Sequence, residues 1–125
     1  MLSHIGTNDL CQKQTVSSTI TDIGNIIDVL RTVNPHIQIL LAQLIGQASF
    51  EDCGVPALNA ELPMLVANKN QPQSPIVLVD QYSGFDPITM TFDGLHPNDL
   101  GDSHMADRWF ETLAPTLDAF HTTPP

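Results

Sequence analysis

Basic residues are scarce in this sequence. Four Lys and Arg stand against fourteen Asp and Glu among 125 residues, so the formal net charge is −10 at pH 7. A surface this negative is repelled by nucleic-acid phosphates and by anionic lipid headgroups. We therefore expect neither nucleic acid nor a membrane as a partner, and neutral ligands suit the charge better.

Long apolar runs are also missing. Hydrophobic residues make up 42% of the chain, which is too many for a disordered tail, yet no run is long enough to cross a bilayer. The first residues lack the basic start and the long apolar stretch of a signal peptide. No repeat or low-complexity tract divides the chain, and its length suits one core, so we expect a single domain over residues 1–125.

Hydrophobic periodicity predicts alternating strands and helices. The predicted strands are residues 2–5, 37–44 and 76–79. The predicted helices are residues 17–33, 56–68 and 105–120. This order predicts an α/β fold, in which right-handed crossovers build a parallel sheet with helices on both faces.

Polar and breaking residues set the expected limits of these elements. Ser17 or Ser18 is available to cap the first helix, Asn34-Pro35 ends it, and Pro115 kinks or restarts the last helix. Doubly wound sheets usually have five or more strands, whereas three are predicted here and the first would lie on an open edge. We therefore expect further strand and helix units before Met1.

Two segments that follow predicted strands carry side chains suited to catalysis. Gly6-Thr7-Asn8-Asp9 follows the first strand, and Asp93-Gly94-Leu95-His96 precedes the last helix. Reactive groups in α/β folds gather on loops at the carboxyl ends of strands. Asp93 could accept a hydrogen bond from Nδ1–H of His96, leaving Nε2 free as a general base. The Asn8 amide could donate to a developing oxyanion.

Each segment also has an ordinary structural interpretation. Asp93 could cap the next helix, and Asn8 with Asp9 could form a turn by bonding to the local backbone. Spacing alone does not decide between the interpretations, so the catalytic hypothesis depends on the two segments occurring together.

In this order, the two segments resemble the third and fifth sequence blocks of the SGNH, or GDSL-type, serine esterases. Those blocks read Gly-x-Asn-Asp and Asp-x-x-His, and Gly6-Thr7-Asn8-Asp9 and Asp93-Gly94-Leu95-His96 match every fixed position. Three further segments are similar to the family-3 carbohydrate esterases, which remove acetyl groups from xylan. These segments are Pro97-Asn98, Met105-Ala106-Asp107-Arg108-Trp109 and Val79-Asp80-Gln81-Tyr82. The resemblance implies the flavodoxin-like SGNH hydrolase fold, with this chain as its C-terminal part.

The resemblance also implies a role for each matching residue. Asn8 would be an oxyanion-hole side chain, His96 the general base and acid, and Asp93 the group that orients His96. Gly6 and Asp9 would support the turn that carries Asn8. The substrate would be an acetylated polysaccharide or a small acetyl ester, with no cofactor, and the acidic composition agrees with a secreted enzyme.

The nucleophile of the family is missing at its expected place. The family's Gly-Asp-Ser motif and a second oxyanion donor, a glycine, both precede the asparagine block, but only five residues precede Gly6. We therefore expect the chain alone to be inactive. Gly101-Asp102-Ser103 spells the motif but follows His96 and falls in the first turn of the last helix, so we do not expect Ser103 to be the nucleophile.

Two other functions stay open at this point. One is an SGNH lipase or lysophospholipase, although no apolar lid is visible in the sequence. The other is a non-catalytic remnant that binds carbohydrate. Phe85, near the expected rim of the site, is the better aromatic candidate for a sugar contact, and His4 borders the Asn8 segment.

Cys11 and Cys53 are the only cysteines. No spacing of cysteine and histidine resembles a zinc site, so we expect no metal. Both cysteines follow strands that should be neighbours, so their Cα atoms could approach to about 6 Å and form a disulfide. Two free thiols are the alternative, and a secreted hydrolase would favour the bond.

Overall fold

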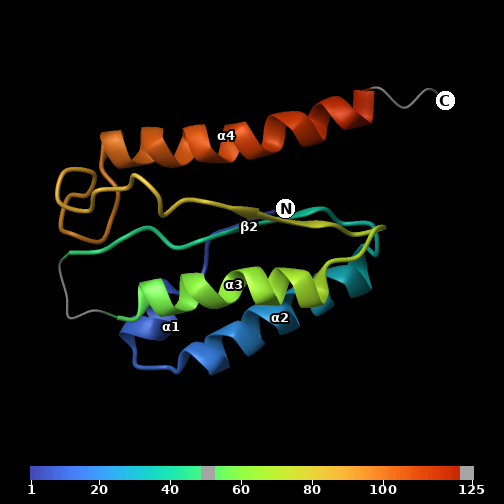
Figure 1. Cartoon of the computed structure of the whole chain (residues 1–125), viewed down its shortest axis with the longest axis horizontal. Helices are drawn as coiled ribbons and strands as arrows, with labels where there is room; N and C mark the ends of the chain where they lie inside the picture. The colour runs from blue at the N-terminus through green and yellow to red at the C-terminus, as the bar shows by residue number, and fades with distance from the viewer. Residues whose placement is uncertain (49–52, 122–125) are drawn as a thin grey trace.

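The computed structural model describes residues 1–48 and 53–121, with side chains described through Leu117. The strands in this part of the chain are β1 (Leu2–Ser3), β2 (Ile39–Ala42) and β3 (Ile76–Val79). The helices are α1 (Thr7–Cys11), α2 (Val16–Val33), α3 (Val55–Lys69) and α4 (Asp99–His121). Helices α2 and α3 cover one face of the sheet and α4 lies over the other (Figure 1).

The sheet is parallel, in the order β1-β2-β3. Leu2 is the register partner of Leu40, and Ile39 is the partner of Ile76. The predicted α/β class, with a parallel sheet between helical layers, is confirmed. Parallel strands in one sheet end at the same edge, so the loops that follow β1, β2 and β3 gather together.

Strand β2 is the centre of the molecule, because each of its four residues is at most 2% exposed. Its side chains alternate between the two faces. Ile39 and Leu41 belong to the core cluster on the side of α2 and α3, whereas Leu40 and Ala42 pack with Val79, Trp109 and Leu113 beneath α4. Burying one such aliphatic side chain stabilises a fold by about 1.5–3 kcal/mol, so β2 joins the two layers firmly.

Helix α2 shows where the predicted boundaries held and where they did not. It ends at Val33, and Asn34 N–H donates to Leu30 O at 2.9 Å, as the Asn34-Pro35 stop predicts. The expected Ser17 or Ser18 cap is wrong. The N-cap is Thr15, whose hydroxyl accepts a hydrogen bond from Ser18 N–H at 3.1 Å, so Ser18 serves as the donor.

The segment predicted as a turn after the first strand is the short helix α1. Gly6 begins it with a φ of 119°, a conformation that L side chains rarely adopt. A Cβ at Gly6 would lie 3.0 Å from Leu58 Cδ2 and 3.3 Å from Thr19 Cγ2. The position therefore needs glycine both for its backbone and for its packing.

Helix α4 is longer than predicted. It begins at Asp99 and continues through Pro115 as one helix to His121, so the expected restart at Pro115 is wrong. Proline removes one backbone donor, but Pro115 is exposed and the packing of Trp109 and Leu113 holds the helix on the sheet.

Candidate active site

A cavity of about 250 Å³ opens where the two predicted catalytic segments meet. Its lining residues are His4, Thr7, Asn8, Ile45, Leu95, His96, Pro97 and Met105. They come from the end of β1, from α1, from the segment after β2, and from the loop before α4 and the helix itself. The structure thus brings Asn8 and His96, which lie far apart in the sequence, to one cavity.

Asp93 and His96 form a directly bonded pair. Oδ2 of Asp93 lies 2.8 Å from Nδ1 of His96, and Oδ1 accepts the N–H groups of Leu95 at 3.0 Å and His96 at 2.8 Å. These bonds, the His96 backbone N–H foremost and then its ring, lower the pKa of Asp93 to about 2. The carboxylate is therefore charged at neutral pH and can hold the imidazole through Nδ1.

The His96 ring is anchored on one side and open on the other. Its side chain is 72% exposed while Nδ1 faces the carboxylate of Asp93. With the proton on Nδ1, the lone pair of Nε2 is left to accept a proton. The arrangement suits a general base.

The loop that carries His96 is held by side chains of its own. Thr91 Oγ1 accepts Gly94 N–H at 2.7 Å, and Phe92 N–H donates to His96 O at 2.9 Å. Gly94 has a φ of 84°, which favours glycine there. The loop thus closes on itself and presents Asp93 and His96 on the same side.

Asn98, and not Asp93, caps helix α4. Its Oδ1 accepts the N–H groups of Leu100 at 3.0 Å and Gly101 at 3.1 Å, and its Nδ2 donates to Thr89 O at 2.9 Å. The Asp93 carboxylate accepts its bonds inside the preceding loop. The ordinary interpretation of Asp93 as a helix cap is therefore wrong.

Asn8 lies in the first turn of α1 and is exposed. Within residues 1–48 and 53–121, no hydrogen bond engages its side-chain amide, and only its backbone oxygen accepts, from Gln12 N–H at 2.9 Å. The alternative in which the Asn8 amide bonds to its own turn is therefore not observed. The amide can donate to a ligand in the cavity.

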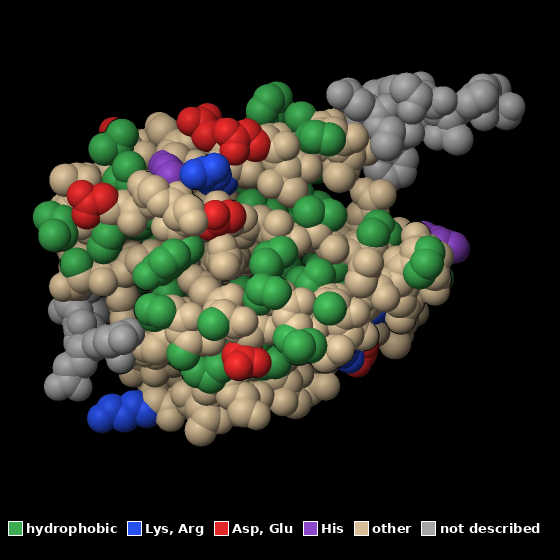
Figure 2. Space-filling model, in the orientation of Figure 1, with side chains coloured by type: hydrophobic (Ala, Val, Ile, Leu, Met, Phe, Trp, Pro, Cys, Tyr) green, Lys and Arg blue, Asp and Glu red, His purple; other side chains and the backbone are tan. Residues whose placement is uncertain are grey.

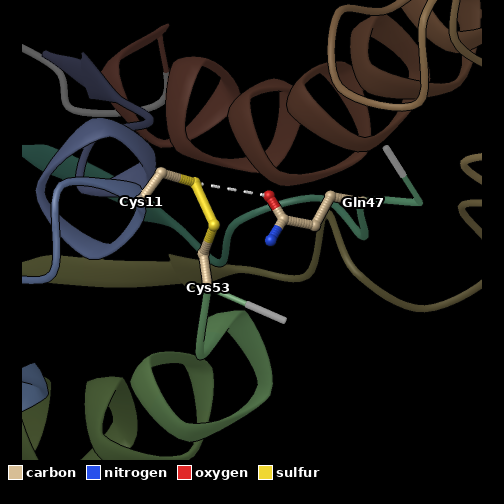
Figure 3. Close-up of a disulfide and its surroundings, with 3 residues drawn as sticks. All are labelled: Cys11, Gln47 and Cys53. Carbon is tan, nitrogen blue, oxygen red and sulfur yellow. Dashed lines mark hydrogen bonds between the residues drawn. A yellow bond between two sulfur atoms is a disulfide. The ribbon is translucent and has the colours of Figure 1, made fainter. Parts of the chain in front are cut away.

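Helix α1 is fixed by its C-terminal end. Cys11 forms a disulfide with Cys53, with the two Cα atoms 4.8 Å apart, and Gln47 lies beside Cys11 (Figure 3). Leu10 is 4% exposed and packs in a core cluster with Leu58 of α3. The disulfide and this packing together set the position of the helix that carries Asn8.

The Asp9 side chain is exposed and has no hydrogen-bond partner in the described part of the chain. Its backbone oxygen accepts Gln14 N–H at 2.9 Å, which closes the end of α1. Asp9 lines a neighbouring hollow of about 310 Å³ together with His4, Gly6 and Asn8. Support of the turn by the Asp9 carboxylate stays a prediction.

His4 contributes more than the sequence indicated. Its Nε2 accepts Ile45 N–H at 3.3 Å, and both residues line the cavity of Asn8 and His96. Burial lowers the pKa of His4, while a backbone hydrogen bond opposes this in part. A neutral ring that accepts at Nε2 ties the end of β1 to the segment after β2. Its position beside the Asn8 segment was the one sequence signal.

Phe85 and Ser103 do not reach this cavity. Phe85 is 7% exposed and lines a second cavity, while its ring packs edge-on against His104 with centroids 5.8 Å apart. Ser103 is exposed on α4, and its hydroxyl donates to Asp99 O at 2.8 Å. Neither residue is among the lining of the His96 cavity.

Nowhere in residues 1–48 and 53–121 do three or more His, Cys, Asp or Glu side chains gather into a group that could hold a metal. Among the described helices, none combines the length and hydropathy that spanning a bilayer requires.

No family model matches the chain, and no curated protein matches it significantly. A carbohydrate esterase family 3 protein from Talaromyces cellulolyticus does match in structure, with a TM-score of 0.87 and 26% identity over 94% of this chain and 58% of that one. A mutant acetyl esterase crystallised with an acetate ion matches with a TM-score of 0.87 and 25% identity over 95% and 58%. The family 3 carbohydrate esterase of Clostridium thermocellum matches with a TM-score of 0.79 and 26% identity over 95% and 57%.

These matches confirm the fold and the resemblance to SGNH-type esterases of carbohydrate esterase family 3. The chain spans 57–58% of the length of the three proteins, so their activities belong to longer polypeptides. The substrates of those three proteins are likewise properties of those proteins.

Proposed function

We propose that this chain is part of a serine esterase of the SGNH type that removes acetyl groups from a polysaccharide. The observation that carries the proposal is the convergence of Asn8 and His96 on one cavity, with Asp93 bonded to the far side of the imidazole. The structural likeness to carbohydrate esterases supports the same class of reaction.

In the proposed reaction, His96 moves the protons. A serine hydroxyl, supplied from outside these 125 residues, attacks the acetyl carbonyl while Nε2 of His96 takes its proton. The tetrahedral intermediate collapses, His96 gives that proton to the departing sugar oxygen, and an acetyl-serine remains. Water, deprotonated by His96, then releases acetate and restores the serine.

Asn8 and Asp93 lower the barrier without exchanging protons. The Asn8 amide donates a hydrogen bond to the oxyanion of each tetrahedral intermediate, where negative charge develops. The charged Asp93 fixes the tautomer of His96 and stabilises the imidazolium that forms during each step. Both roles are inferred from the residue types and from their positions around the cavity.

The size and lining of the cavity favour a small acyl group. About 250 Å³ lined by Ile45, Leu95, Pro97 and Met105 accommodates an acetyl group, whereas a long acyl chain would need a longer apolar channel. We therefore favour acetyl esters, with acetylated xylan as the substrate, over the esters cleaved by a lipase or lysophospholipase. The net charge of −10 also favours a neutral polysaccharide.

The test joins the chain to the coding region that precedes Met1 and measures acetate release from acetylated xylan. We expect that region to encode a strand followed by Gly-Asp-Ser, and we expect release that disappears in the His96→Ala variant. Preference for an aryl butyrate or octanoate over the acetate would contradict the acetyl assignment.

The 125-residue chain alone should not turn over an aryl acetate. Rapid mixing followed by mass spectrometry of the protein checks this, because a serine esterase accumulates an acyl-enzyme. An acetyl group attached to Ser103 would overturn the assignment of the nucleophile.

A further inference from the structure

A second cavity, of about 640 Å³, lies beside the one that holds Asn8 and His96. Its lining residues are Gly46, Gln47, Val55, Pro56, Tyr82, Ser83, Gly84, Phe85 and Pro87. The segment after β2 borders both cavities, since Ile45 lines the first and Gly46 and Gln47 line the second. The next residue, Ala48, donates its N–H to Gly94 O at 2.8 Å and so ties this segment to the loop of His96.

One wall of the second cavity is held rigidly from behind. Asp80 Oδ1 accepts the N–H groups of Tyr82 at 3.0 Å and Ser83 at 2.8 Å. Arg108 of α4 donates from Nη2 to Ser83 O at 3.1 Å. A ligand would therefore meet a wall that is already in place, which reduces the entropy cost of binding.

The segment after β2 contributes to the lining an amide group, that of Gln47, with an unmet hydrogen bond. Gln47 Oε1 lies 3.6 Å from Cys11 Sγ (Figure 3), and Nε2 is buried without a partner among the described residues. Exchanging the oxygen and nitrogen of this amide would not remove the problem, because one of the two atoms would still lack a partner. An occupant that offers a hydroxyl, which can both donate and accept, would give this amide its missing partner once the Gln47 side chain turns toward the cavity.

The remaining lining is neutral and partly aromatic. It contains the aromatic residues Tyr82 and Phe85, the hydroxyl-bearing Ser83 and several aliphatic residues, and the described lining residues include no Lys, Arg, Asp or Glu. Neutral hydrogen-bonding groups beside aromatic faces suit an uncharged polyhydroxylated ring. An anionic ligand would find no cation among the described lining residues and a net charge of −10 on the chain.

We infer that the second cavity binds an unsubstituted, neutral sugar unit of the polysaccharide whose acetylated unit enters the His96 cavity. This inference rests on the proposed function for the identity of the chain, and it adds the place where the rest of that chain is held. Tyr82, which is 39% exposed, would cover one face of the sugar, and Gln47 would bond to a hydroxyl. Both are binding residues and take no part in the chemical step.

The test measures binding of xylotriose to the 125-residue chain by titration calorimetry or by amide chemical shifts. We expect saturable binding that weakens about tenfold or more in Tyr82→Ala and is retained in Tyr82→Phe, which keeps the ring. Gln47→Leu, which removes the amide at similar volume, should also weaken binding. Phe110→Ala is the matched control, since Phe110 is 69% exposed on α4 and lines neither cavity.

The outcomes separate this inference from the proposed function. His96→Ala should leave the xylotriose affinity unchanged, because the imidazole is outside the second cavity. Retained xylotriose binding with no acetate release from the longer polypeptide would refute the esterase and leave the sugar site standing. Absence of xylotriose binding, equal loss in Phe110→Ala, or equal affinity for trigalacturonate would overturn the sugar site.

Discussion

The carboxylate of Asp93 is the most constrained charged group of the candidate site. It is exposed, yet three donors from one short loop reach its two oxygens, and the imidazole of His96 is one of them. Because two of the donors are backbone N–H groups, the carboxylate is oriented even before the ring binds. A base that must present Nε2 to a substrate gains from a partner whose own position is fixed.

The pH dependence of this pair follows from the lowered pKa of Asp93. The folded state holds the proton less tightly than an ordinary aspartate does, whose pKa is 3.8, so the stabilising contribution is fully present above about pH 4. It is lost as the pH falls through about 2. Carbon NMR of the Asp93 carboxyl should give a midpoint near 2 that rises only part of the way in His96→Ala, because the backbone donors remain. A midpoint near 4 in the unmodified chain would contradict the hydrogen bonding described above.

Asn8 is expected to act on kcat. In the proposed complete enzyme, Asn8→Ala should lower kcat by about 10²–10³ with little change in KM, because the role proposed for the amide is to bind the oxyanion and not the ground state. Steady-state kinetics on an aryl acetate measure both constants. Asn25→Ala, which changes an exposed asparagine of α2 outside the cavity lining, is the control and should have a small effect. An unchanged kcat in Asn8→Ala would remove Asn8 from the oxyanion hole.

Among the elements, α1 depends most on its first residue. Gly6→Ala should destabilise the fold by about 2–4 kcal/mol, since φ is 119° and the added methyl would meet Leu58 Cδ2 at 3.0 Å. Urea unfolding followed by circular dichroism gives the free energy. Gly54→Ala is the matched control, because φ is 86° there but no atom of the described residues lies within 4 Å of the new Cβ, so about 1 kcal/mol is expected. Equal losses in the two variants would show that packing against Leu58 contributes nothing.

The disulfide joins the end of α1 to the start of α3 across a sequence separation of 42 residues. Chain entropy predicts that breaking a loop of this length destabilises the fold by about 4 kcal/mol. Unfolding of the chain with and without a reductant measures the loss. The double variant Cys11→Ala, Cys53→Ala serves as the control and should be insensitive to the reductant. A loss below about 1 kcal/mol would mean that packing around Leu10 alone holds α1.

Periodicity predicted the long helices because α2 and α3 repeat their apolar residues over enough positions to show a period. Strand β2 was predicted from a continuous apolar run, which suits a strand buried on both faces. Helix α1 was missed for the opposite reason. Five residues are too few for a period, and the helix exists because Gly6 fits against Leu58 and the disulfide fixes Cys11. Local sequence thus predicts the longer helices and strands, whereas α1 depends on tertiary contacts that local sequence does not show.

The residues of the candidate site likewise divide into those that the sequence predicted and those that only the structure shows. Asn8, Asp93 and His96 stand in sequence blocks that a resemblance can match, and the structure brings Asn8 and His96 to one cavity. His4 and the second cavity carried little or no signal in the sequence, because both depend on which loops the sheet places side by side. Phe85 was expected at the rim of the site, but packing against His104 turns it into the second cavity.

At the scale of the whole molecule, charge is the dominant property. Acidic side chains gather over and beside α4, while hydrophobic side chains occupy the face between α4 and α3 (Figure 2). The net charge of −10 creates a field that repels anions. This repulsion is strong at 0.01 M salt, where the screening length is about 30 Å, and much weaker at 0.15 M salt, where the screening length is about 8 Å.

This field predicts how salt would affect the proposed esterase activity of a polypeptide that contains this chain. Raising the salt from 0.01 to 0.15 M should increase kcat/KM several-fold for an acetyl ester that carries a carboxylate. An uncharged aryl acetate of similar size is the control and should change little. Equal responses of the two substrates would show that the net charge does not influence encounter.

The Asn98 side chain holds two parts of the molecule at once, so losing its hydrogen bonds would affect both. Its oxygen caps the start of α4, and its nitrogen donates to the backbone of Thr89, which precedes the loop that carries His96. Heat that frays the first turn of α4 would break both sets of hydrogen bonds together, so His96, the proposed general base, would lose its orientation while the layers around β2 were still intact. Inactivation on warming would then precede melting of the core.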